Sequence, residues 1–121
     1  MIDNQTRRDV GAAADVTDFG SVHWAVRDGH PAGAELTVGL ATFNAGKSNV
    51  EHTHPNCEEV VYVLDGEVEH TLGDQTTILR SGDLIVVPRN VPHRLINNSD
   101  AACRTYIVFS SSDRQFVPTG R

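Results

Sequence analysis

The most informative part of the sequence is residues 46–66, which read GKSNVEHTHPNCEEVVYVLDG. His52 and His54 are two positions apart, so on a β-strand both side chains leave the same face. Glu59 follows His54 by five positions, and His93 comes after the turn residues 88–92. Three imidazoles and one carboxylate form a ligand set suited to a divalent first-row metal ion. These four residues are therefore candidate metal ligands.

Two longer spacings contain these residues. The first is Gly46-x5-His52-x-His54-x4-Glu59-x6-Gly66, and the second is Gly82-x5-Pro88-x-Asn90-x2-His93-x3-Asn97. They resemble the two motifs of the cupin family, and the short segment between them is similar to that of small bacterial single-domain cupins. One position departs from the pattern, because the family usually has Gly where this chain has Asn90. Asn tolerates the left-handed backbone that such a turn requires, so we expect the site to be intact.

The resemblance implies a fold and a metal site. The fold is an all-β, double-stranded β-helix jelly-roll barrel, and the ion inside it is Fe, Mn, Ni or Zn. It carries over His52, His54, Glu59 and His93 as ligands. Burying these four groups in a small barrel without a cation would be costly, which also favours bound metal over an empty polar cluster.

The pattern along the rest of the chain agrees with an all-β fold. Short segments rich in Val, Ile, Thr and Leu alternate with turn residues, and no segment has a helical period of useful length. The expected strands are residues 22–26, 35–44, 49–54, 59–64, 67–72, 76–79, 84–87, 93–97 and 104–109. Residues 1–20 lack a sustained period, so we expect an N-terminal arm over 1–20 and a barrel domain over 21–121.

The strand register distinguishes Glu58 from Glu59 as the acidic ligand. If residues 65–66 form a two-residue hairpin turn, the strands 59–64 and 67–72 pair with each other. Glu59 then lies on a largely apolar face that suits a barrel interior, whereas Glu58 faces the other way. We therefore predict that Glu59 is the ligand.

The same register places His70 opposite Val61 and diagonal to Glu59. His70 should then face into the barrel. One interpretation is a catalytic residue that lines the pocket and touches substrate or a water molecule. The alternative is a core histidine satisfied by one hydrogen bond.

Composition narrows the kinds of partner. The chain has 121 residues with 10 Lys and Arg against 16 Asp and Glu, a net charge of −6. Such an acidic chain repels phosphate backbones, so we expect no nucleic-acid partner. No apolar run is long enough to cross a bilayer, and the first residues lack the apolar stretch of a signal peptide. We therefore expect a cytoplasmic protein whose two cysteines, Cys57 and Cys103, are thiols.

Two strands are apolar on both faces, namely residues 60–64 and 84–87. A sandwich on its own needs only one apolar face per strand. Open sheet edges also invite pairing between chains. Both features predict a homodimer.

Several functions are compatible with this ligand set. Four protein ligands leave two positions open on an octahedral ion. With Fe, substrate and O₂ could bind side by side, as in a dioxygenase acting on a small organic acid, diketone or sugar-derived substrate. With Mn, Zn or Ni, Lewis-acid chemistry would give an isomerase, lyase or decarboxylase. The third possibility is a binding or sensor protein without turnover.

Three further side chains could recognise a substrate. Arg94 follows the His93 ligand, and Arg104 and Tyr106 share a face of the last expected strand. A guanidinium matches a carboxylate in a bidentate manner, which makes the arginines candidates for a carboxylate clamp. The alternative for each is a structural or surface role.

Overall fold

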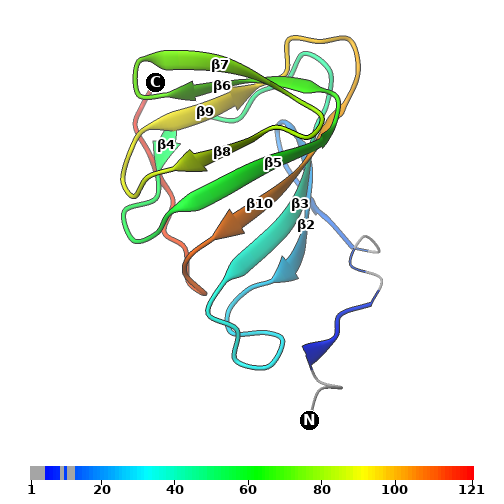
Figure 1. The fold of residues 1–121 in the computed structure, drawn as a ribbon, viewed down its shortest axis with the longest axis vertical. Coiled ribbons are helices and arrows are strands. Elements are labelled where there is room, and N and C mark those ends of the chain that lie inside the picture. The colour runs from blue at the N-terminus through cyan, green and yellow to red at the C-terminus, as the bar shows by residue number, and fades with distance from the viewer. Residues whose placement is uncertain (1–4, 9, 11–12) are drawn as a thin grey trace.

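The chain folds into two antiparallel sheets (Figure 1). The computed structural model describes residues 5–8, 10 and 13–121. Its strands are β1 (Asp15–Val16), β2 (Gly20–Val26), β3 (Thr37–Phe43), β4 (His52–Thr53), β5 (Glu59–Asp65), β6 (Glu67–Leu72), β7 (Gln75–Arg80), β8 (Leu84–Val87), β9 (His93–Ile96), β10 (Cys103–Phe109) and β11 (Val117–Pro118). The six-stranded sheet has the order β1-β2-β3-β10-β5-β8, and the five-stranded sheet has the order β11-β4-β9-β6-β7.

Buried and exposed side chains alternate along the strands, and the buried ones form a core between the two sheets. In β5, Glu59, Val61 and Val63 are buried while Tyr62 is exposed. Successive residues of a strand point to opposite faces, so one side of each strand faces the interior. The core includes Phe43 and Phe109, and it continues directly into the buried polar residues described below.

The all-β architecture and the nine expected strands are confirmed. The bounds differ by at most two residues except in the expected strand 49–54, of which only His52–Thr53 is strand. Two short strands, β1 and β11, were not predicted from the sequence. Each has only two residues, which is too short for an alternating pattern to be recognised.

The expected hairpin between β5 and β6 is wrong. β5 pairs with β10 and β8, whereas β6 pairs with β7 and β9 in the other sheet. The chain passes between the sheets at Gly66, which has a φ of 84°. A Cβ atom there would lie 2.6 Å from the carbonyl oxygen of Ala102, so glycine is required by space as well as by conformation.

Part of the expected N-terminal arm is described. β1 pairs with β2, and β2 begins at Gly20, one residue before the expected start of the barrel. Residues 1–4, 9 and 11–12 of the expected arm lie outside the described residues. The division into an arm and a barrel remains a prediction.

Within the described ranges, there is no helix with the length and apolar character needed to span a membrane. Cys57 and Cys103 are both buried and free, as expected.

Candidate metal centre

Three strands from the two sheets bring the four predicted ligands together. His52 opens β4, and His54 follows that strand directly. His93 opens β9 and is the direct cross-strand partner of His52. Glu59 opens β5 in the opposite sheet, so the cluster lies between the two sheets.

The four side chains are buried and converge on one point. One ligand atom from each lies within 4.8 Å of the others. Oε1 of Glu59 lies 2.9 Å from Nε2 of His93 and 3.3 Å from Nε2 of His54. The rings of His52 and His93 have centroids 4.2 Å apart. This arrangement corresponds to a set of donors around a single small ion.

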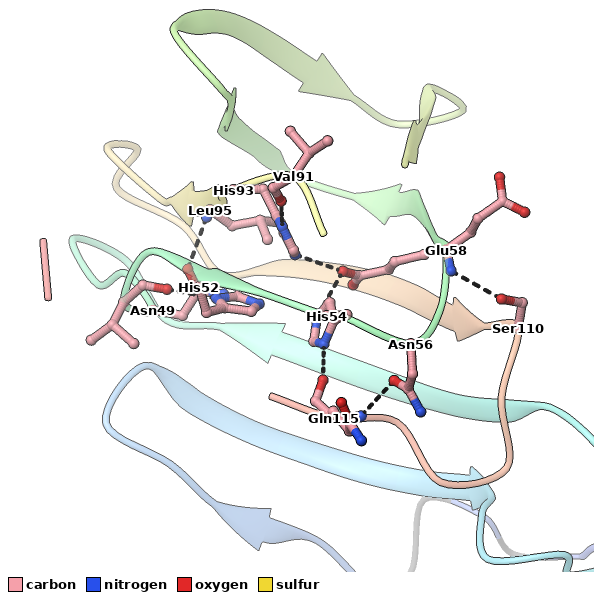
Figure 2. Close-up of polar contacts among 12 residues, drawn as sticks. Asn49, His52, His54, Asn56, Glu58, Val91, His93, Leu95, Ser110 and Gln115 are labelled. Carbon is pink, nitrogen blue, oxygen red and sulfur yellow. Dashed lines mark hydrogen bonds and ion pairs between the residues drawn. The ribbon is translucent and has the colours of Figure 1, made fainter. Parts of the chain in front are cut away.

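Hydrogen bonds orient each imidazole toward the centre (Figure 2). Nδ1 of His52, His54 and His93 lies 2.7 to 2.9 Å from the carbonyl oxygens of Val50, Gln115 and Val91, respectively. A carbonyl accepts only, so each Nδ1 carries a proton, which leaves Nε2 as the ring nitrogen available to a metal ion. Backbone support of this kind is typical of metal-binding histidines.

One nitrogen of the four-residue cluster is buried without a hydrogen-bond partner in the described protein. Nε2 of His54 is fully buried and makes no hydrogen bond, despite its proximity to Glu59. An unsatisfied buried nitrogen is unfavourable, whereas a cation at the centre would satisfy it. The donor set and this unpaired atom therefore fit a divalent metal ion.

The electrostatics of Glu59 and His52 favour the protonation states that a metal requires, whereas those of His93 favour its protonated form. Burial opposes ionisation of Glu59, but the imidazoles of His54 and His93 outweigh it and lower the pKa to about 2. Burial lowers the pKa of His52 to about 4. Burial also disfavours protonated His93, but the hydrogen bond and charge of Glu59 prevail and raise its pKa. At neutral pH, Glu59 is ionised and His52 is neutral, and both can bind metal without losing a proton.

A cavity of about 560 Å³ adjoins the cluster. His52, His54 and Glu59 form part of its wall, and much of the remainder is aromatic. The aromatic side chains are those of Phe19, Trp24, Phe43, Phe109 and Phe116. The volume is within the usual range for a small-molecule site.

His70 lies in the interior, as predicted, but in a different register. It pairs with Thr77 and Leu95 rather than lying opposite Val61. Its side chain is fully buried, and its ring stacks on His93 at a centroid distance of 6.0 Å. It is not among the residues that line the 560 Å³ cavity. Neither ring nitrogen has a hydrogen-bond partner in the described residues.

The three candidate substrate clamps lie elsewhere. Arg94 donates to the carbonyl oxygen of Asn49 and to Oγ of Ser48. Arg104 is exposed and paired with Asp65, and Tyr106 is 43 % exposed on the same outer face. None of the three lines the cavity.

The arginine that does line the cavity is Arg114, which sequence reasoning missed. It lies after the last long strand in a segment without periodicity. The only signal was Phe116, an aromatic residue in an otherwise polar tail that indicates packing against the barrel. Phe116 indeed stacks on His52 with centroids 4.4 Å apart.

Comparison with known proteins identifies relatives of this chain. Protein SchB of Streptomyces halstedii is 39% identical over 67 residues, covering 55% of this chain and 49% of the relative. Polyketide synthase CurC of Streptomyces cyaneus is 37% identical over 67 residues, covering 55% and 44%. The chain thus spans about half the length of these curated relatives.

Solved structures share the architecture. The polyketide cyclase RemF from Streptomyces resistomycificus superposes with a TM-score of 0.82 at 19% identity, covering 96% of this chain and 86% of that one. A recombinant oxalate oxidase in complex with glycolate also has a TM-score of 0.82 at 19% identity, covering 95% and 63%. At this identity the similarity concerns the fold.

The sequence model of the family described as cupin domain matches residues 39–109, a range that contains all four residues of the cluster. This match covers more than half of the 121 residues, and the jelly-roll neighbours agree with it. The chain belongs to the cupin family.

Proposed function

We propose that this cupin binds one divalent metal ion through His52, His54, Glu59 and His93 and acts as a metal-dependent enzyme on a small organic molecule. The observation that carries the proposal is the convergence of one ring nitrogen from each of the three histidines with the Glu59 carboxylate, while every Nδ1 faces a backbone carbonyl. The ion is Fe, Mn, Ni or Zn, since imidazole and carboxylate ligands accept each of these.

Dioxygenase-type chemistry on a small organic acid, diketone or sugar-derived substrate is the first candidate reaction. A bound ion of this kind supplies redox or Lewis-acid chemistry at coordination positions that the protein leaves open. The protein's own part is to bind and orient the substrate in the cavity beside His52 and His54. The apolar part of its wall offers a surface for the body of the substrate.

Lewis-acid chemistry is the second candidate, with isomerase, lyase or decarboxylase outcomes. Two observations favour it. The cavity has aromatic walls that suit a planar substrate. One relative at 37% identity is named a polyketide synthase, and RemF, a structural neighbour, is named a polyketide cyclase. Under a third alternative, the same site binds a small molecule without turnover.

His70 is proposed to act on the site through His93. Its ring is parallel to that of His93 within 10° and is buried behind it. A role in direct contact with substrate would require the cavity to extend past His93.

The test begins with elemental analysis of untagged protein purified without chelator. Near one equivalent of Fe, with oxygen uptake on catechols, diketones or thiols, would support the dioxygenase. Mn, Zn or Ni, with no oxygen uptake after reloading with Fe, would favour Lewis-acid chemistry. If no metal is present and none is taken up on titration, the enzyme proposal is refuted and a binding role remains.

We also propose a homodimer formed through the outer face of the six-stranded sheet. Tyr62, Leu84, Val86 and Tyr106 are exposed there on adjoining strands, and each is at least 36 % accessible. A cluster of exposed apolar and aromatic side chains on one sheet face is typical of a protein–protein contact.

A further inference from the structure

Arg114 places a positive charge at the wall of the cavity. Its guanidinium carbon lies 4.8 Å from the ring centroid of Trp24, 4.9 Å from that of Phe109 and 5.8 Å from that of Phe116. All three rings also line the cavity. The side chain is therefore surrounded by aromatic surface and half removed from solvent.

This guanidinium forms no ion pair with an acid in the described part of the chain, although the charge of Glu59 favours its protonated form. Arg27, Arg80 and Arg104 each form an ion pair with a neighbouring acid. Arg114 forms no ion pair and no hydrogen bond within residues 5–8, 10 and 13–121. Aromatic faces stabilise a cation, but they leave its N–H donors unused. Burial lowers the pKa of Arg114, yet a guanidinium stays charged under all ordinary conditions.

The backbone on both sides of Arg114 is fixed. Nδ2 of Asn56 donates to the carbonyl oxygen of Asp113 at 2.8 Å, and Oδ1 of Asn56 accepts from the backbone N–H of Gln115 at 2.9 Å. The carbonyl of Gln115 in turn accepts from Nδ1 of His54. The same segment thus carries the cation and supports a proposed metal ligand, and Figure 2 shows the contact of Gln115 with His54.

We propose that Arg114 binds the carboxylate of an aromatic acid whose ring system packs against Trp24, Phe109 and Phe116. The unused donors supply a bidentate match to a carboxylate, and the aromatic walls supply the surface for a planar apolar body. This assignment rests on the proposed function in one respect: His52, His54 and Glu59 line the same cavity, so the bound acid is the substrate of the proposed metal centre.

The experiment compares two probes that differ in charge. 2-Naphthoate carries the carboxylate, and 2-naphthamide is its neutral counterpart of nearly the same shape. Binding of each is measured by calorimetry on metal-free and on metal-loaded protein. We expect 2-naphthoate to bind the metal-free protein. Arg114→Gln should raise its dissociation constant at least tenfold, roughly the effect of losing one pair of charge-assisted hydrogen bonds. The dissociation constant of 2-naphthamide should change by less than about threefold.

Two variants serve as controls. Arg80→Gln removes one positive charge from an exposed position on β7 and should leave binding of both probes unchanged. Arg114→Lys keeps the charge without the bidentate geometry, so its affinity for 2-naphthoate should lie between those of wild type and Arg114→Gln. If Arg114→Gln does not fold, as judged by circular dichroism, the weaker binding of 2-naphthoate to Arg114→Lys still tests the assignment.

The outcomes separate the two proposals. Equal losses for 2-naphthoate and 2-naphthamide, no loss for either, or no binding of 2-naphthoate to wild type would each overturn the assignment of Arg114. Absence of metal would refute the proposed function alone, because the comparison on metal-free protein does not require the ion. An Arg114-dependent 2-naphthoate site without metal would indicate a carboxylate-binding cupin.

Discussion

Glu58 and Glu59 are neighbours in sequence but have opposite environments. Glu58 is exposed, whereas Glu59 is 4 % exposed and lies between His54 and His93. The difference follows from the period of two along a strand. The residue that opens β5 on its inner face becomes the candidate ligand, and its neighbour does not.

The first prediction uses this pair. Glu59→Gln removes the negative charge that faces the imidazoles, so metal affinity should fall on the order of tenfold or more. Glu58→Gln is the matched control and should bind metal as wild type does. Metal per chain after dialysis, followed by competition with a chromophoric chelator, gives the comparison. Equal affinities for the two variants would remove Glu59 from the proposed site.

The second prediction concerns His70 and pH in the metal-free protein. Burial lowers the pKa of His70 from 6.5 to about 4, with a smaller effect in the same direction from His93. As the pH falls from about 6.5 toward 4, the unfolded chain takes up a proton that the folded chain does not, so stability is lost in this window. Wild type should therefore lose on the order of 1 to 2 kcal/mol more than His70→Leu between pH 7 and pH 5.

Urea unfolding at both pH values provides the measurement. His52, which is buried like His70, contributes to both proteins and cancels in the comparison. His30→Leu, at an exposed position, should keep the wild-type pH dependence. Since both His70 nitrogens are unpaired, His70→Leu should be at least as stable as wild type at pH 7. Identical pH dependence in wild type and His70→Leu would contradict the burial argument.

At the scale of elements, the segment after β10 completes the site. It contributes the carbonyl of Gln115 to His54, the ring of Phe116 to His52, and β11 to the edge of β4. Asn56, in the loop between β4 and β5, holds this segment through three hydrogen bonds, to Ser111, Asp113 and Gln115. The loop and the tail therefore form one unit with His54.

The third prediction tests that unit. Asn56→Ala removes these three hydrogen bonds, so the free energy of unfolding should fall by about 1 to 3 kcal/mol. Because Gln115 then supports His54 less firmly, metal affinity should also fall by roughly tenfold. Asn98→Ala removes a hydrogen bond between exposed Asn98 and Glu69 and serves as the control. Chemical denaturation and chelator competition report the two effects, and a stability loss with unchanged metal affinity would separate Asn56 from the site.

At the scale of the whole molecule, the outer face of the six-stranded sheet remains apolar. Tyr62 pairs across the strands with Leu84 on one side and with Tyr106 on the other, which makes a continuous exposed row. The two strands that are apolar on both faces, β5 and β8, are therefore both in this sheet. One face of each lies against the core, and the other is exposed on the outer side of the sheet.

The fourth prediction is an oligomeric state. Light scattering at micromolar concentration should give wild type about twice the chain mass of 13.2 kDa. Tyr62→Glu places a charge in the middle of the row and should give the monomer, because a desolvated unpaired charge opposes association. Ile78→Glu, on exposed β7 of the other sheet, should remain dimeric. A monomeric wild type would rule out the dimer.

Much of this molecule could be predicted from local patterns. The nine expected strands and the inward direction of Glu59 and His70 follow from alternation within each strand, and the four-residue cluster follows from a motif spacing. The inward direction of Glu59 is correct although the predicted hairpin is not. The strands β5 and β6 belong to different sheets, but the inner faces of both point into the barrel.

The sequence by itself determined which residues alternate inward and which four could share a metal, since period and spacing need no knowledge of distant neighbours. Only the tertiary structure decided that β5 pairs with β10 and β8, that Gln115 supports His54 across 61 positions, and that Arg114 faces the cavity. The physical reason is that the pairing of strands and the contacts of the tail depend on residues far apart in the sequence. These residues satisfy the sheet edges and pack the interior only in the complete fold. A segment without periodicity, such as residues 110–116, has no local signal from which that choice could be predicted.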